Sequence, residues 1–263
     1  MAGVSEQAFF VELGDGRFRS TNHTVGPWDP QLQHGGPPSA LIGRCLERTE
    51  PRDDMRLVRV TVEILGAVPV AELTVTTRLT RPGKRVEMLE ASVSAGGRDV
   101  VRATAWRISA EPGRAEPVAR EYAAPPRPLV AHESLFAGLG HFGYGEAVEW
   151  RFAAGGFAEP GPARVWTRLR GVVVEGEKPS GWQRVLAVAD SGNGVSSALP
   201  MTEWLFINPD LTVALHREPV GEWVCLDATT TIDDAGIGLA ASDLSDDAGW
   251  IGRGLQTLLV ARR

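Results

Sequence analysis

The stretch 207–217, INPDLTVALHR, decides the fold that the sequence predicts. It opens with Asn-Pro-Asp and then alternates between apolar and polar residues, which predicts a half-buried β-strand entered through a turn. An apolar, helix-like run ending at Asp190 precedes it, and three strand-like runs follow it, the last carrying Gln256. We therefore expect one acid and two amides, Asp190, Asn208 and Gln256, to lie on separate elements beside one sheet and to activate a water molecule.

The composition is that of an ordinary globular chain. Its 263 residues suffice for one large domain or two modest ones that share a core. The hydrophobic share of 43% and the charged share of 23% are typical of soluble proteins, and 30 glycines with 18 prolines indicate many turns and hence many strands. The net charge of -6 argues against nucleic-acid binding, because phosphates dominate such affinity.

The cysteines, histidines and apolar runs predict a cytoplasmic protein without metal or cofactor. Cys45 and Cys225 lie far apart in the chain, so neither a disulfide framework nor a metal motif is indicated, and the histidines have no ligand spacing. No apolar run approaches the roughly 20 residues of a membrane span. The first ten residues, MAGVSEQAFF, lack the basic and apolar regions of a signal peptide.

Each half of the chain predicts a helix followed by a meander of strands. In the first half the predicted helix covers residues 37–48, and the predicted strands cover 8–13, 57–66, 72–80, 85–95 and 99–109. Residues 111–130 hold five prolines and predict an extended linker. In the second half the predicted helix covers 180–190, capped by Ser180, and the predicted strands cover 146–153, 163–173, 203–217, 222–232, 236–244 and 249–261.

The two halves also align with each other. Residues 68–72, VPVAE, correspond to residues 218–222, EPVGE, at a spacing of 218 − 68 = 150, and Ala-Ser pairs at 91 and 241 keep that spacing. Shared order and spacing predict two copies of one helix-plus-meander unit. We therefore expect an α+β fold with two helix-wrapped antiparallel sheets from an internal duplication, in the order 1–110, linker 111–135, and 136–263.

A helix wrapped by an antiparallel sheet, given twice in one chain, is the double-hotdog arrangement. The stretches GPWDPQLQHGGPPSALIGRCLE, RLTRPGKRVEMLEASVSAGGRDVVRATA, NPDLTVALHREPVGEWVCLDATTT and GLAASDLSDDAGWIGRGLQTLLV resemble the TesB-like acyl-CoA thioesterases of the thioesterase II family. The resemblance implies a hydrolase that converts acyl-CoA to a free acid and coenzyme A, with further assembly into a homodimer or higher homo-oligomer.

The resemblance also implies which side chains handle the water. The family has an Asp at the end of the second helix, a Thr entering the next strand and a Gln in the last strand. Asp190 and Gln256 match two of these positions, and Asn208 stands where the family has Thr. Asn offers both a donor and an acceptor, so it can orient a water. A thiolate is a good leaving group, so hydrolysis needs an aimed water and oxyanion donors rather than a strong acid.

Further residues are expected to contact the substrate. His34, Gly35 and Gly36 begin the first helix, where glycines let backbone amides approach a ligand. Backbone amides near Gly181 and Trp182, at the start of the second helix, are expected to face the oxyanion. Nine residues separate Gly181 from Asp190, and the same distance from His34 reaches a glycine, at position 43, instead of an acid. One active site per chain is therefore expected.

Simpler interpretations and two other functions stay open. Asp190 also fits a solvated residue after a helix, Asn208 a turn residue and Gln256 an edge-strand amide. A basic group at 81–85, Arg81, Lys84 and Arg85, fits a solvated hairpin better than a site for coenzyme A phosphates. A hotdog hydratase or dehydratase would carry an acid before Asn208-Pro209, and here Phe and Ile stand there. A non-catalytic acyl-CoA binding module is the third hypothesis.

Overall fold

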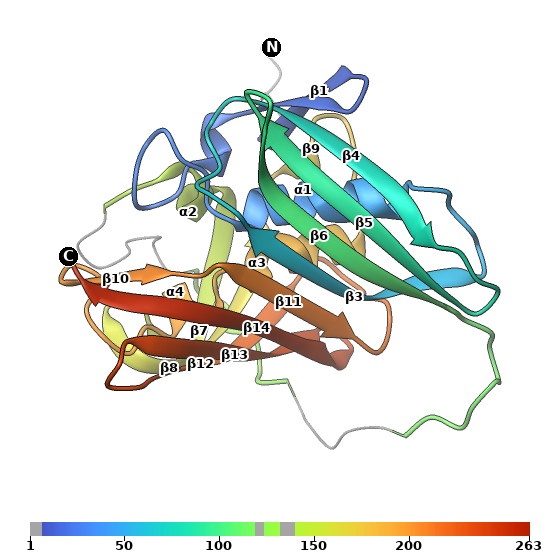
Figure 1. Ribbon diagram of the computed structural model, residues 1–263. Coiled ribbons are helices and arrows are strands. Elements are labelled where there is room, and N and C mark those ends of the chain that lie inside the picture. Colours follow the sequence, from blue (N-terminus) through green and yellow to red (C-terminus); the bar gives the residue numbers. More distant parts are fainter. Residues whose placement is uncertain (1–6, 119–123, 132–139) are drawn as a thin grey trace, which may run out of the picture.

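The protein is mostly β-sheet with a few helices (Figure 1). The computed structural model describes residues 7–118, 124–131 and 140–263; the remaining residues, which include the first six and parts of the predicted linker, lie outside the described residues. The helices are η1 (Asn22–Thr24), α1 (Gly36–Glu47), α2 (Gly143–Ala147), α3 (Gly181–Ala189) and α4 (Gly192–Val195). The strands are β1 (Ala8–Gly14), β2 (Arg17–Ser20), β3 (Met55–Ile64), β4 (Glu72–Arg81), β5 (Val86–Ala95), β6 (Arg98–Ser109), β7 (Val148–Gly156), β8 (Glu159–Leu169), β9 (Val172–Val174), β10 (Trp204–Ile207), β11 (Asp210–Leu215), β12 (Val224–Ile232), β13 (Ile237–Asp246) and β14 (Gly249–Arg262).

The strands form one continuous sheet whose two halves have the same order. From the middle outwards the first half runs β3-β6-β5-β4-β2-β1, and the second half runs β11-β14-β13-β12-β8-β7. The halves join where β3 and β11 pair antiparallel, and there the hydroxyls of Thr61 and Thr212 lie 3.1 Å apart. The order of strands along the sheet is thus the same in both halves, as the sequence alignment predicts.

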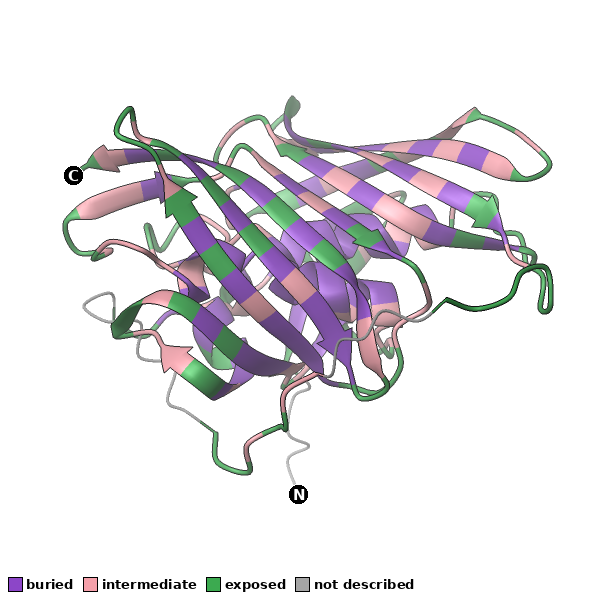
Figure 2. Ribbon diagram, turned by 90° about the horizontal axis from the view of Figure 1, so that it is seen from below, coloured by how far each residue is buried: buried purple, intermediate pink, exposed green. Residues whose placement is uncertain are grey.

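Helices α1 and α3 pack against each other on the inner side of the sheet (Figures 1 and 2). Both helices are almost wholly buried, and the strands over them alternate between buried and exposed residues. Gly43 permits the close crossing, because a Cβ there would lie 2.6 Å from Leu186 Cδ1. Two prolines occupy the first turn of α1, where a missing N–H has no helical partner. None of the helices in the described ranges has the length and apolar character needed to cross a membrane.

Two predicted strands are each divided in the structure. The predicted strand 203–217 is β10 and β11, separated at Asn208-Pro209, because proline has no N–H to donate to the ladder. Both pieces pair with β14, and their registers differ by one residue. The predicted strand 163–173 is β8 and then β9, and β9 pairs with β1 in the first half. Single runs of apolar residues do not reveal such breaks.

Three smaller features also differ from the sequence prediction. The predicted strand 146–153 begins only at Val148, after the short helix α2. Strand β2 and helix α4 were not predicted, since four residues give too short a periodic pattern.

The predicted helices at 37–48 and 180–190 are α1 and α3, each within one residue of the predicted ends, and Ser180 caps α3 by accepting from the amide of Gln183.

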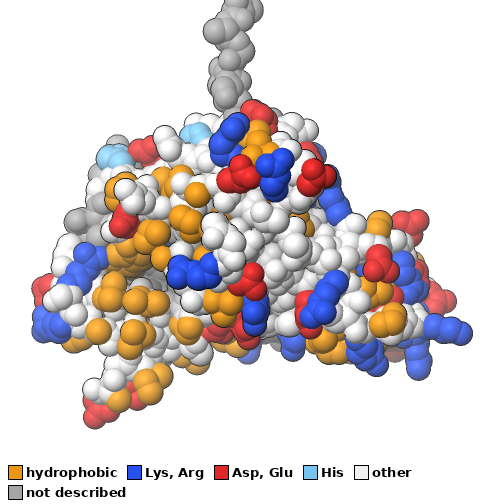
Figure 3. Space-filling model, turned by 45° about the horizontal axis from the view of Figure 1, so that its top comes forward, with side chains coloured by type: hydrophobic (Ala, Val, Ile, Leu, Met, Phe, Trp, Pro, Cys, Tyr) orange, Lys and Arg blue, Asp and Glu red, His pale blue; other side chains and the backbone are white. Residues whose placement is uncertain are grey.

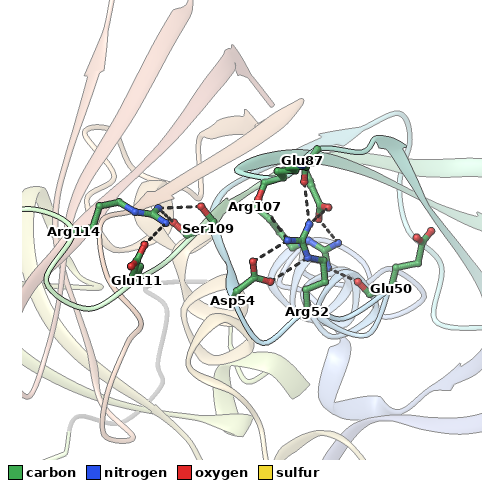
Figure 4. Close-up of polar contacts among 10 residues, drawn as sticks. Glu50, Arg52, Asp54, Glu87, Arg107, Ser109, Glu111 and Arg114 are labelled. Atoms are coloured by element: carbon green, nitrogen blue, oxygen red, sulfur yellow. Dashed lines mark hydrogen bonds and ion pairs between the residues drawn. The ribbon is translucent and has the colours of Figure 1, made fainter.

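A buried ion pair anchors the C-terminal end of α1 (Figure 4). Arg107 on β6 donates to a carboxylate oxygen of Glu87 on β5 at 2.7 Å, and both side chains are at most 5% exposed. Arg107 also donates to the carbonyls of Thr49 and Glu50, which follow α1 and have no helical partner. Burial raises the pKa of Glu87, but Arg107 and Arg52 outweigh it and hold that pKa below its usual value.

We expect Glu87→Gln to destabilise the fold by about 3–5 kcal/mol, because it leaves the buried Arg107 without its counter-charge. Glu90→Gln, three residues along the same strand, removes the exposed ion pair with Arg78 and is expected to cost at most about 1 kcal/mol. Urea denaturation of both variants measures the difference. Equal midpoints for the two variants would contradict the anchoring role of Glu87.

Candidate active site

Asp190 ends helix α3 and is nearly buried, with 7% of its surface exposed. A carboxylate at a helix C-terminus meets the negative end of the helix dipole, so it needs donors from elsewhere. The interpretation of Asp190 as a solvated residue is therefore wrong. Its immediate surroundings supply the donors, the side-chain amides of Asn208 and Gln256.

Two side-chain amides bind one oxygen of this carboxylate. Asp190 Oδ1 accepts from Asn208 Nδ2 at 2.8 Å and from Gln256 Nε2 at 3.1 Å. Gln256 Nε2 also donates to the backbone carbonyl of Asp190 at 2.9 Å, and Gln256 Oε1 accepts from the amide of Asn193 at 3.1 Å. Gln256 is 2% exposed, and these partners define which of its ends is the amide nitrogen. The three predicted residues thus lie together.

Asn208 occupies the break between β10 and β11, which turns its side chain toward α3. Its Nδ2 also donates to the carbonyl of Asp210 at 3.3 Å, so both amide hydrogens have acceptors. Within the described part of the chain, no protein donor reaches Asn208 Oδ1. The side chain therefore holds Asp190 and keeps one acceptor free.

The N-terminal end of α1 covers the other carboxylate oxygen. His34 Nδ1 lies 3.3 Å from Asp190 Oδ2, and the same nitrogen accepts from the amide of Gly36 at 3.0 Å. A Cβ at Gly35 would lie 2.7 Å from Asp190 Oδ2, and one at Gly36 would lie 2.1 Å from the carbonyl oxygen of Ala187. The two glycines are thus required by the close approach of α1 to the end of α3.

Tyr144, which the sequence analysis did not single out, fixes the position of His34. The two rings stack with centroids 3.9 Å apart and planes at 7°. The phenol oxygen of Tyr144 lies 2.9 Å from the carbonyl of Ala187, to which it donates, and 2.7 Å from Ser191 Oγ. Tyr144 lies in the short helix α2, where a tyrosine between glycines gives no periodic signal, so only the folded chain reveals this role.

These groups open into a cavity of about 530 Å³. His34, Gly35, Asp190, Asn208 and Gln256 line it on one side. The rest of the lining is mostly apolar and comes from both halves: Trp28, Leu32, Ile64, Leu65, Val68, Phe142, Met201, Leu205, Phe206 and Ile207. Hydrophobic side chains gather on the left of the face in Figure 3, the side on which Figure 1 places α2 and β10. The described lining holds no Lys or Arg, so the cavity suits an apolar group.

Comparison with known proteins decides the family. The family model of the acyl-CoA thioesterase N-terminal domain matches residues 24–108, and that of the C-terminal domain matches residues 115–260. The chain belongs to the acyl-CoA thioesterase family. It is accordingly a thioester hydrolase. None of the curated proteins matches it in a sequence search.

Solved structures share the fold at low sequence identity. A hotdog-fold protein of unknown function from Alicyclobacillus acidocaldarius has a TM-score of 0.73 and 14% identity, covering 97% of this chain and 96% of its own. A suspected thioesterase II from Thermobifida fusca has a TM-score of 0.71 and 17% identity, covering 98% and 96%. Acyl-CoA thioesterase II TesB2 from Mycobacterium marinum has a TM-score of 0.64 and 14% identity, covering 97% and 95%. These similarities establish the hotdog fold.

The predicted oxyanion amides at Gly181 and Trp182 lie elsewhere in this thioesterase. They begin α3, a helix of nine residues and thus about 13 Å long, whereas Asp190 follows its other end. A Cβ at Gly181 would lie 2.6 Å from the carbonyl oxygen of Pro219, and neither residue lines the cavity. The prediction failed because α1 and α3 pack antiparallel, so the helix start beside Asp190 belongs to α1.

The basic hairpin residues Arg81, Lys84 and Arg85 are also distant from the cavity. Arg52, just after the C-terminal end of α1, donates to the carbonyl of Gly83 in this hairpin, whereas the cavity lies at the N-terminal end of α1. Twelve helical residues separate the two ends by about 18 Å. The solvated-hairpin interpretation therefore fits these residues.

The chemistry available in the cavity is that of an acid, a histidine and two amides. Burial lowers the pKa of His34, although the charge of Asp190 opposes this, so the imidazole is neutral near pH 7. Within the ranges that the structure describes, no three His, Cys, Asp or Glu side chains gather into a set that could hold a metal ion. A carboxylate held by two amides is suited to accept a proton from water.

We expect Gly35→Ala to lower thioesterase kcat by about 10²-fold, because its Cβ displaces a carboxylate oxygen that must be positioned accurately. The backbone of Gly35 has φ -67° and ψ -18°, which alanine adopts freely. Gly66→Ala is the control, since Gly66 also lines the cavity and a Cβ there meets no atom within 4 Å. Steady-state kinetics and melting temperatures check both; unchanged kcat in Gly35→Ala would refute the close contact.

Proposed function

We propose that this thioesterase hydrolyses acyl-CoA with Asp190 as the general base. One observation carries the proposal: two amides occupy Asp190 Oδ1, whereas Oδ2, beside His34, has no amide donor among the described residues, and Asp190 lines the cavity. Donors on one oxygen make that oxygen less basic and leave the proton to the other. The amides thus orient the carboxylate, whereas the sequence analysis expected them to orient the water directly.

The attacking water then has two acceptors. Asp190 Oδ2 accepts one hydrogen, and the free Oδ1 of Asn208 accepts the other, which aims an oxygen lone pair into the cavity. The water oxygen forms a bond to the thioester carbon while Asp190 takes its proton. Asn208 thereby replaces the family threonine, because an amide supplies a donor to Asp190 and an acceptor for water at the same time.

The amide of Gly35 is the proposed oxyanion donor. In the first turn of α1 the amide of Gly36 donates to His34, and the next two residues are prolines without N–H groups. Within the described residues the amide of Gly35 has no acceptor, and it lies at the positive end of the α1 dipole. This role takes the place of the one predicted for Gly181 and Trp182.

The apolar lining of the cavity supports the proposal that it encloses the acyl group of the substrate. Its lining is mostly apolar and has no cation among the described residues, so the coenzyme A phosphates stay outside while the acyl chain enters. The repeated strand order supports an internal duplication as the origin of the two halves. Assembly into homo-oligomers, a cytoplasmic location and the boundaries 1–110 and 136–263 stay predictions.

We expect Asp190→Asn to lower kcat by about 10²- to 10⁴-fold, because the variant has no base for the water. Glu203→Gln, which makes the same chemical change in an exposed ion pair with Arg262, is expected to leave kcat unchanged. Release of free thiol from a panel of short, medium, long and aryl acyl-CoAs measures the rates. Equal rates in wild type and Asp190→Asn would refute Asp190 as the base.

The same panel separates the other two functions. Hydration of crotonyl-CoA without thiol release would favour a hydratase, and saturable binding without turnover would favour a binding module. Either result would overturn the proposed hydrolysis of acyl-CoA. Release of free thiol at a rate that depends on acyl length would support it and would identify the acyl class.

The role of Asn208 is tested by two substitutions, threonine and valine, whose side chains have nearly the same shape as each other. Asn208→Thr is expected to keep kcat within about tenfold, because a hydroxyl both donates and accepts. Valine has the shape of threonine but no polar side-chain atom. Asn208→Val is therefore expected to lower kcat by about 10²- to 10³-fold, as removal of one preorganised donor does. Kinetics with one acyl-CoA compares them. Similar kcat values for the two variants would show that the polar atoms of Asn208 have no part in catalysis.

A further inference from the structure

His34 Nδ1 stands between two partners that require different states of the ring. The amide of Gly36 donates to this nitrogen at 3.0 Å, which requires a free lone pair. Asp190 Oδ2 lies 3.3 Å from the same nitrogen, and a bond to that oxygen requires a proton between them. With an ionised Asp190 and a neutral His34, the Gly36 bond prevails and the ring proton is on Nε2. Once Asp190 takes a proton, its Oδ2 becomes a donor toward Nδ1.

The other ring nitrogen is available to the substrate. His34 lines the cavity, and its side chain is 15% exposed. Within the described residues Nε2 has no hydrogen-bond partner. Stacking on Tyr144 holds the ring plane, so the Nε2–H has a fixed direction. The ring thus has one nitrogen at the base and another accessible from the cavity.

We propose that His34 is a catalytic residue that passes the proton taken up by Asp190 to the departing thiolate sulfur. This inference rests on the proposed function, because it assigns the path of the same proton. Water attack forms the C–O bond and moves a proton to Asp190 Oδ2. Collapse of the tetrahedral intermediate breaks the C–S bond and leaves the electron pair on sulfur. Asp190 gives its proton to His34 Nδ1 while Nε2 gives its own proton to sulfur.

The protons and bonds of this relay balance. Water supplies the hydroxyl of the acid and, through the relay, the proton of the thiol, and Asp190 returns to its ionised form. His34 ends with its proton on Nδ1. It returns to the first tautomer when Nε2 takes a proton from water and the Nδ1 proton leaves through Asp190 Oδ2 to water. No oxidant, reductant or metal takes part.

The groups that face His34 agree with a neutral ring. Asp190, at the end of α3, is the charged group in contact with it. Tyr144, from α2, is fully buried, and burial raises the pKa of its phenol far above the ordinary value, so it stays neutral. Burial lowers the pKa of His34 more than Asp190 raises it. The ring therefore carries one proton near pH 7, as the relay requires.

A change of leaving group tests the relay. Coenzyme A is an alkyl thiol with a pKa near that of cysteine, about 8.5, so its thiolate gains from a proton. An aryl thiolate is a far weaker base and leaves unprotonated. For His34→Gln we expect kcat to fall about 10²-fold with an acyl-CoA and to change less than about threefold with the aryl thioester of the same acid. Glutamine still accepts from the Gly36 amide but cannot pass a proton on.

The controls separate the relay from the proposed function. Asp190→Asn should lose activity on both esters, whereas Tyr144→Phe, which keeps the stacked ring, should retain the wild-type ratio between them. Equal losses of His34→Gln on both esters would show a positioning role and overturn the relay, as would no loss on either. If wild type hydrolyses neither ester, the proposed function itself fails. Activity of the variant on the aryl ester also shows that it folds.

The pH dependence gives an independent readout. Protonation of His34 at acid pH fills Nδ1 and stops the relay, so wild-type kcat on the acyl-CoA should fall as pH drops through the lowered pKa of His34, which lies below about 6.5. This limb should be missing from the profile of His34→Gln. An identical acid limb in the profiles of the wild type and of His34→Gln would overturn the relay.

Discussion

The antiparallel contact between α1 and α3 determines where the active site lies. It requires glycine at two points: Gly43 permits the crossing over Leu186, and Gly36 lies against the carbonyl of Ala187. Because the helices run in opposite directions, the positive N-terminus of α1 meets the negative C-terminus of α3. Asp190 stands at that junction, where the side-chain amides of Asn208 and Gln256 compensate its charge.

The opposite end of the helix pair also holds an acid, Glu47, but this acid does not line the cavity. There the start of α3 meets the end of α1, and Ser180 and Gln183 both bond to Glu47 at 2.9 Å. Pro219 packs on Gly181. The loop at residues 66–68, its counterpart in the first half, instead lines the cavity. This difference supports the expectation of one active site per chain.

Asn208 illustrates how a break in a strand serves chemistry. Pro209 cannot join the ladder, so β10 and β11 pair with β14 in different registers. The residue before the proline is thereby released from the sheet and turns its amide to Asp190. An amide there gives the carboxylate a donor and leaves an acceptor free, which a hydroxyl also does. Replacement of the family threonine by asparagine therefore preserves the hydrogen-bonding capacity of the position.

The sequence alone determined helices α1 and α3, most of the strands and the likeness of the two halves, and its resemblance to the thioesterase family indicated Asp190 and Gln256. The helices and strands follow from local periodicity, which acts over a few residues. Only the tertiary structure decided that Gly35 rather than Gly181 stands beside Asp190, and that Tyr144 supports His34. These contacts join segments more than 100 residues apart, and their pairing depends on the direction in which two buried helices pack, which no local pattern records.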